Sequence, residues 1–174
     1  MSGDQNRRTP PWLFELIQHD IIKRKFKLDA AADRRNALCK RFYDEHADGL
    51  KQPWRDPTFC NPPFLHFGDW IRKGYEEALA RVGEDDKVVC LIGPCGSSQT
   101  WFHRYARAGT IYVPDQRLVF FDSQTGEPTH GADRDSMIYV LGPGFWNKRY
   151  KDGRFLVKPL AVQGLVVTKK KVAL

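Results

Sequence analysis

The chain has 174 residues, a length that fits one domain and leaves little room for a second. Its hydrophobic content of 41% is enough for a globular core without disulfide bonds, and its net charge of +7 suits a polyanionic partner such as nucleic acid. The four cysteines lack the paired spacing of a zinc site, and no apolar run is long enough to span a bilayer. We therefore expect a single cytoplasmic domain over residues 1–174, without a signal peptide or a bound metal.

The first part of the chain, residues 9–109, is predicted to alternate between helices and strands. Thr9 is expected to cap a helix with Pro10 at its first position, where the missing N–H of proline costs nothing. A buried strand is predicted within residues 26–32, and Asp33 is expected to cap a helix that follows it.

Stronger periodic signals follow along the chain. A short strand is predicted at residues 58–60. Residues 66–82 have one apolar face, which predicts an amphipathic helix that ends at Gly83. Residues 88–92 form a continuous apolar run, as expected of a buried parallel strand, and a short helix is expected before Gly109.

Strand-like segments predominate in the second part, residues 110–174. They are predicted at residues 111–113, 118–121, 137–141, 155–157 and 160–167. Strands alternating with helices, followed by a strand-rich end, predict an α/β domain in which helices flank a mixed sheet in three layers.

The most informative motif is Asn61-Pro62-Pro63-Phe64, which follows a predicted strand and precedes a predicted helix. Two prolines cannot continue a central strand, so the motif is expected to form a loop at the carboxyl end of the sheet, where open α/β sheets bind ligands. A different interpretation is a plain turn, because asparagine before proline commonly begins one.

The motif suits methylation of an amino group on a nucleobase. The lone pair of such an amine is delocalised into the ring, which makes the amine a poor nucleophile. The Asn61 side-chain oxygen and the Pro62 carbonyl can accept hydrogen bonds from the amine, and the prolines hold these acceptors in place. Phe64 offers a ring on which a base extruded from a duplex can stack.

Four segments, in order, resemble the phage-type DNA N-6-adenine methyltransferases. They are residues 8–14 with Thr9-Pro10, residues 28–32 with Leu28-Asp29-Ala30, Asp48-Gly49-Leu50, and residues 59–64 with the Asn-Pro-Pro-Phe loop. The resemblance extends more weakly to residue 121. It depends on the spacing of all four segments together.

The resemblance implies a Rossmann-like, S-adenosylmethionine-dependent methyltransferase that acts on the N6 amine of adenine in double-stranded DNA. The implied catalytic residues are Asn61, Pro62, Pro63 and Phe64, and the implied cofactor-binding residues are Thr9, Pro10, Asp29, Ala30, Asp48 and Cys60. The chain departs from the wider methyltransferase pattern because three alanines replace the usual glycine-rich turn after the first strand. Asp29 as a helix cap and Asp48 as a turn residue stay open as alternatives.

Target recognition is expected in residues 114–158, where basic and aromatic side chains alternate. The candidate DNA-binding residues are Arg117, Lys148, Arg149 and Lys151. A solvated loop is the alternative for this region.

Two other kinds of function use related motifs or folds. One is methylation of adenine in RNA or of a glutamine amide in a protein, and the other is DNA binding without catalysis. The basic charge favours a nucleic acid. The sequence determines neither the target site nor the oligomeric state, nor whether the methyl mark protects a phage genome or serves a restriction-modification partner.

Overall fold

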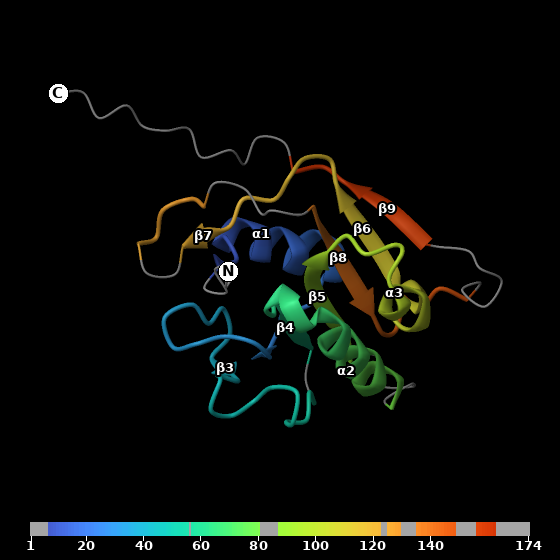
Figure 1. Ribbon diagram of the computed structural model, residues 1–174, viewed down its shortest axis with the longest axis horizontal. Helices are drawn as coiled ribbons and strands as arrows, with labels where there is room; N and C mark the ends of the chain where they lie inside the picture. The colour runs from blue at the N-terminus through green and yellow to red at the C-terminus, as the bar shows by residue number, and fades with distance from the viewer. Residues whose placement is uncertain are drawn as a thin grey trace.

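The computed structural model describes residues 7–55, 57–80, 87–122, 125–129, 135–148 and 156–162. Within them, seven strands form one sheet (Figure 1). Their order across the sheet is β3 (Arg41–Phe42), β2 (Leu28–Asp29), β4 (Thr58–Cys60), β5 (Val89–Pro94), β8 (Ser136–Leu141), β6 (Thr110–Pro114) and β9 (Leu156–Leu160).

The sheet is mixed because one strand is reversed. Strands β3, β2, β4 and β5 are parallel, whereas β8 runs antiparallel to both β5 and β6. Strand β9 is parallel to β6. The apolar run predicted to be a buried parallel strand is β5, which is buried throughout and pairs with β4 on one side and β8 on the other.

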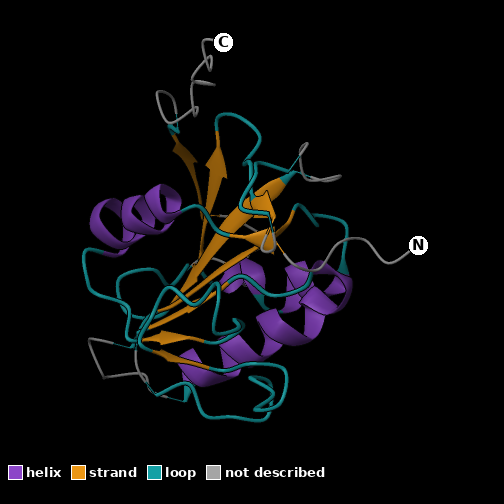
Figure 2. Cartoon of the chain, turned by 90° about the vertical axis from the view of Figure 1, so that its left-hand side faces the viewer, coloured by secondary structure: helices purple, strands orange, loops and turns teal. Residues whose placement is uncertain are grey.

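Helices cover both faces of this sheet (Figure 2). Side chains alternate along β5, so that Cys90 and Ile92 point into one core cluster while Val89 and Leu91 point into the other. The first cluster contains side chains of α1 (Pro11–Leu16) and of the π-helix η1 (Ile17–Ile22), and the second contains those of α2 (Phe67–Leu79) and α3 (Thr100–Arg104). The predicted α/β domain with a three-layer core is confirmed.

A two-stranded sheet lies beside the main one. It pairs β1 (Arg7–Arg8) with β7 (Phe121–Asp122) in antiparallel register. The strand predicted at residues 118–121 is wrong in extent. Leu118 and Phe120 enter the first core cluster without strand pairing, and only Phe121 belongs to a strand.

The beginning of the first helix is shifted by one residue from its predicted position. Pro10 occupies the capping position, and its carbonyl accepts hydrogen bonds from the N–H groups of Leu13 at 3.0 Å and Phe14 at 3.2 Å. Pro11 is then the first helical residue. Thr9 precedes the cap, which leaves its hydroxyl available for another partner.

The helix predicted after Asp33 does not form. The Asp33 carboxylate accepts hydrogen bonds from the N–H groups of Arg35 and Asn36, which makes a local turn. The chain then enters β3, whose residues pair with β2. The amphipathic helix predicted over 66–82 is α2, and residues 81–86 lie outside the described residues. No helix among the described residues is long and apolar enough to cross a membrane.

Gly93 of β5 makes room for the Phe67 ring at the start of α2. A Cβ atom at position 93 would lie 2.1 Å from that ring, which is fully buried. We expect Gly93→Ala to lower the free energy of unfolding by about 1–3 kcal/mol, because overpacking forces the ring or the strand to move. Urea unfolding followed by circular dichroism measures this.

Gly68→Ala in α2 is the matched control. Its Cβ atom would lie 3.3 Å from the Trp101 side chain, so the substitution should be much better tolerated. Equal losses of stability in the two variants would contradict this account of Gly93.

Candidate active site

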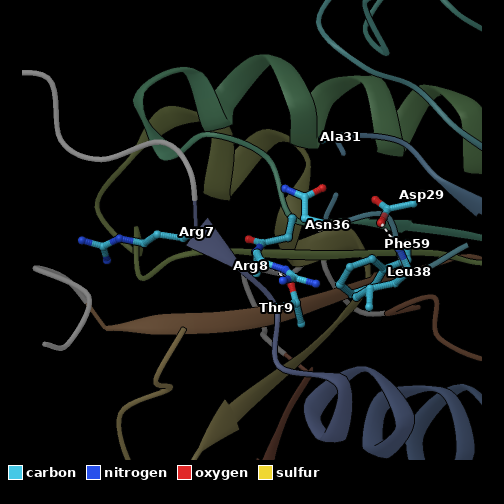
Figure 3. Close-up of a pocket in the computed structure, with 9 residues that line it drawn as sticks. Arg7, Arg8, Thr9, Asp29, Ala31, Asn36, Leu38 and Phe59 are labelled. Atoms are coloured by element: carbon cyan, nitrogen blue, oxygen red, sulfur yellow. Dashed lines mark hydrogen bonds between the residues drawn. The ribbon is translucent and has the colours of Figure 1, made fainter. Parts of the chain in front are cut away.

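A pocket lies at the carboxyl ends of β2 and β4, where three segments distant in sequence meet (Figure 3). It spans about 220 Å³, part of it open to solvent, and its lining residues are Arg7, Arg8, Thr9, Asp29, Ala31, Asn36, Leu38, Phe59 and Asn61. Parallel pairing of β2 with β4, with Asp29 opposite Phe59, brings the ends of these strands together. The pocket therefore lies where open α/β sheets bind ligands.

The Asp29 carboxyl group is the most unusual feature of this pocket. Only 3% of the residue is exposed. Its Oδ2 atom accepts a hydrogen bond from the Leu38 N–H at 3.1 Å, while Oδ1 has no hydrogen-bond partner among the described residues. Burial raises the pKa of Asp29 to about 6, opposed by the N–H groups of Leu38 and Ala31. A buried carboxylate with one free oxygen is suited to binding a positively charged group.

Asn61 and Thr9 meet in the same pocket although 52 positions separate them. The Asn61 side-chain N–H donates a hydrogen bond to the Thr9 hydroxyl oxygen at 2.9 Å. Thr9 is buried, and Asn61 is partly exposed. In this orientation the Asn61 carbonyl oxygen, which the sequence predicts to be a hydrogen-bond acceptor for an amine, does not take part in the contact with Thr9.

Phe64 lies in the one-turn helix η2 (Phe64–His66), between the Pro-Pro segment and α2. Its half-buried ring meets Phe67 edge-on, with 6.3 Å between ring centres and 71° between planes. Phe67 in turn packs against Trp101 and Tyr139. Phe64 is therefore packed against a cluster of aromatic side chains, while part of its ring stays accessible to solvent.

Other predicted cofactor residues lie outside the pocket lining. Ala30 is buried, and its N–H bonds the Phe59 carbonyl at 2.8 Å, while its neighbour Ala31 lines the pocket. Pro10 caps α1. Cys60 is buried in the second core cluster, where burial holds the pKa of its thiol well above the usual range.

Asp48 is held in a local turn. Its backbone is left-handed, with φ of 54°. Its carboxylate accepts a hydrogen bond from the Leu50 N–H and pairs with Lys51 at 2.9 Å. The structure does not bring Asp48 into the pocket, and its predicted cofactor contact stays a prediction.

Six pocket residues were not predicted from the sequence as site residues: Arg7, Arg8, Ala31, Asn36, Leu38 and Phe59. Asn36 and Leu38 reach the pocket only because residues 33–40 form a loop in place of the expected helix. Arg7 extends away from the other pocket side chains (Figure 3). The sequence signal for Asn36 was its place shortly after Leu28-Asp29-Ala30, in the segment that resembles the first cofactor-binding strand of the family and the helix after it.

Two of the four predicted DNA-binding residues lie within the described residues. Arg117 is exposed and pairs with Asp135 at 3.2 Å, and Lys148 is exposed. Arg149 and Lys151 lie outside the described residues. Within the described part of the chain, no group of three or more His, Cys, Asp or Glu side chains could hold a metal ion.

The comparison with known families shows which family this chain resembles over most of its length. A family model described as "DNA N-6-adenine-methyltransferase (Dam)" matches residues 2–152. The chain belongs to this family. The predicted family is confirmed, and its description names adenine N6 methylation of DNA.

Two phage relatives agree with this membership in the DNA N-6-adenine-methyltransferase family. A protein of that name from Escherichia phage T1 is 24% identical over 135 residues, which cover 67% of this chain and 55% of the relative. A protein of the same name from Haemophilus phage HP1 (strain HP1c1) is 25% identical over 139 residues, which cover 78% of this chain and 77% of the relative. The chain thus spans little more than half the length of the phage T1 relative.

We expect the burial of the Asp29 carboxylate, with one oxygen lacking a hydrogen-bond partner, to lower the stability of the protein. The pKa of this carboxyl group is raised from 3.8 to about 6 in the folded protein, so ionisation at higher pH opposes folding, and the cost disappears as pH falls below 4. We expect Asp29→Asn to stabilise the protein without cofactor at pH 8 by up to ~3 kcal/mol, with the gain shrinking as pH falls through 6. Thermal unfolding at several pH values measures this, and a gain independent of pH would contradict the assignment.

Proposed function

We propose that this chain transfers a methyl group from S-adenosylmethionine to the N6 amine of an adenine extruded from double-stranded DNA. The observation that supports it best is the convergence of Asp29, Thr9 and Asn61 in one pocket at the ends of parallel strands. Together with the mixed sheet, this placement supports a Rossmann-like methyltransferase fold.

The pocket residues fit the amino-acid end of the cofactor. The free Oδ1 atom of Asp29 would bind the ammonium group, and Thr9 and Asn36 would line the same end of the site. When bound, S-adenosylmethionine supplies an electrophilic methyl group. Asp29 would hold the cofactor by charge and hydrogen bonding without exchanging a proton with the substrate.

The catalytic loop would act by preorganised hydrogen bonding. The Asn61 carbonyl oxygen and the Pro62 carbonyl would accept the two N–H groups of the adenine amine, which concentrates its lone pair toward the methyl donor. Phe64, supported by Phe67, would stack on the extruded base. Thr9 would hold the Asn61 amide so that its oxygen faces the amine.

The remaining proposals concern DNA and location. Lys148, Arg149 and Lys151 would contact DNA phosphates, while Arg117 would first have to exchange its ion pair with Asp135. The phage origin of both relatives supports action in the cytoplasm of a bacterial host.

The decisive experiment offers the purified protein radiolabelled S-adenosylmethionine with duplex DNA, RNA or a protein extract, and locates the methyl group by mass spectrometry. N6-methyladenine in DNA is the expected product. Label confined to RNA or protein would overturn the proposal. Sequencing of methylated positions in the DNA product then identifies the target site.

The roles of Asn61 and Thr9 can be separated by substitution. We expect Asn61→Ala to lower kcat by about 100-fold or more, because a preorganised acceptor is lost, with little change in cofactor affinity. Thr9→Val removes the hydroxyl at nearly constant volume and should lower kcat by about tenfold, whereas Thr9→Ser should retain activity.

A double substitution provides the control for this pair. A carboxylate at position 61 has two equivalent acceptor oxygens and does not need the hydroxyl to choose between them. Provided that Asn61→Asp retains measurable turnover, adding Thr9→Val to it should change kcat little. The same loss in both backgrounds would assign Thr9 to another role.

Cofactor binding should follow the charge of Asp29. Because its pKa is about 6 without ligand, affinity for S-adenosylmethionine should weaken as pH falls through 6, and Asp29→Asn should weaken binding and remove this dependence. Isothermal titration calorimetry between pH 5 and 8 measures it. Asp69→Asn, an exposed carboxylate in α2 outside the pocket, is the control and should bind like the parent protein.

A further inference from the structure

Leu65 is exposed to an unusual degree for an apolar side chain beside a catalytic loop. Its exposed fraction is 73%, against 51% for Val157, 48% for Leu79 and 41% for Val119, the other large exposed hydrophobic residues among those described. It belongs to neither core cluster. Its burial therefore contributes little to folding, and its side chain is accessible to a partner at the surface.

The local backbone holds Leu65 in this exposed position. It is the middle residue of η2, a turn closed by the hydrogen bond from the Phe67 N–H to the Phe64 carbonyl. A 3-10 turn separates successive side chains by roughly 120°, so the contact of Phe64 with Phe67 turns Leu65 away from that ring. The following helix α2 is anchored by the buried side chains of Phe67 and Ile71.

The neighbouring residues identify what Leu65 would meet. It directly follows Phe64 in η2, so its exposed side chain belongs to the same short segment to which the proposed function brings an adenine of the duplex. Removing a base from a duplex leaves a gap in the stack, and unstacking costs a few kcal/mol. Proteins that unstack DNA often insert an apolar wedge such as leucine between the bases.

We propose that Leu65 enters the duplex and fills the space vacated by the extruded adenine. Phe64 and Leu65 then divide two tasks between adjacent positions. The first holds the base outside the helix, and the second prevents it from returning to the stack. This inference rests on the proposed function, because it requires a base to be extruded toward Asn61.

The experiment uses three duplexes that carry the methylated site identified by sequencing. In the first, 2-aminopurine replaces the target adenine and reports unstacking by fluorescence; the second has the normal paired adenine; and the third has the adenine but lacks the opposite base, so that its adenine needs little energy to leave the helix. Unstacking in the first duplex and single-turnover methylation of the other two are compared for the parent protein, Leu65→Ala, Leu65→Met and Leu79→Ala.

Leu65→Ala is expected to reduce both the fluorescence rise and the methylation of the paired duplex by about tenfold, and to stay within about twofold of the parent protein on the duplex with the missing base. Leu65→Met keeps an apolar wedge and should retain activity. Leu79→Ala, a surface leucine at the end of α2, should behave like the parent protein throughout.

Other outcomes overturn the inference in recognisable ways. Equal losses on both duplexes would mean that Leu65 supports the Phe64 loop, and unchanged activity would mean that it does not enter DNA. A change in sedimentation behaviour on Leu65→Ala, with loss of activity that depends on protein concentration, would identify a contact between two copies of the chain. Absence of methylation by the parent protein would count against the proposed function itself.

Discussion

The pairing of β2 with β4 is the constraint on which the site depends. Because the two strands are parallel and Asp29 lies opposite Phe59, the residues that follow each strand emerge at the same edge of the sheet. The backbone bond from the Ala30 N–H to the Phe59 carbonyl, at 2.8 Å, extends this pairing beyond the strands. The Asp29 carboxylate and the Asn61 amide thus come from separate segments to one pocket.

The carboxyl group of Asp29 is buried in the pocket in a way that opposes folding. Its burial raises the pKa, and one of its oxygens has no hydrogen-bond partner among the described residues. An arrangement of this kind opposes folding in the absence of a cationic ligand and favours binding when one is present. The loop of residues 33–40 is part of the same arrangement, because its Leu38 N–H binds the other oxygen.

The loop of residues 61–64 combines support from the core with partly exposed side chains. Phe67 anchors α2 in the second core cluster and contacts Phe64, so the loop is connected to the core through one aromatic ring. Gly93 of β5 leaves the space that this ring occupies. On the other side of the loop, Thr9 connects Asn61 to the segment that leads into α1. Catalysis by positioning depends on such supports more than on the pKa of any one group.

The sequence by itself determined the α/β class, the strand at β5, the helix α2 and the loop that begins at Asn61. These depend on hydrophobic periodicity, on prolines that exclude a strand, and on a motif whose parts are adjacent in the chain. The tertiary structure decided which polar side chains share the pocket. Local propensity predicted a helix after Asp33, but a helix would have used the Leu38 N–H internally, and Asp29 binds it instead. The contact between Thr9 and Asn61, and the separation of Asp48 from the pocket, likewise depend on strand register and loop paths, which are non-local and leave no periodic signal in the sequence.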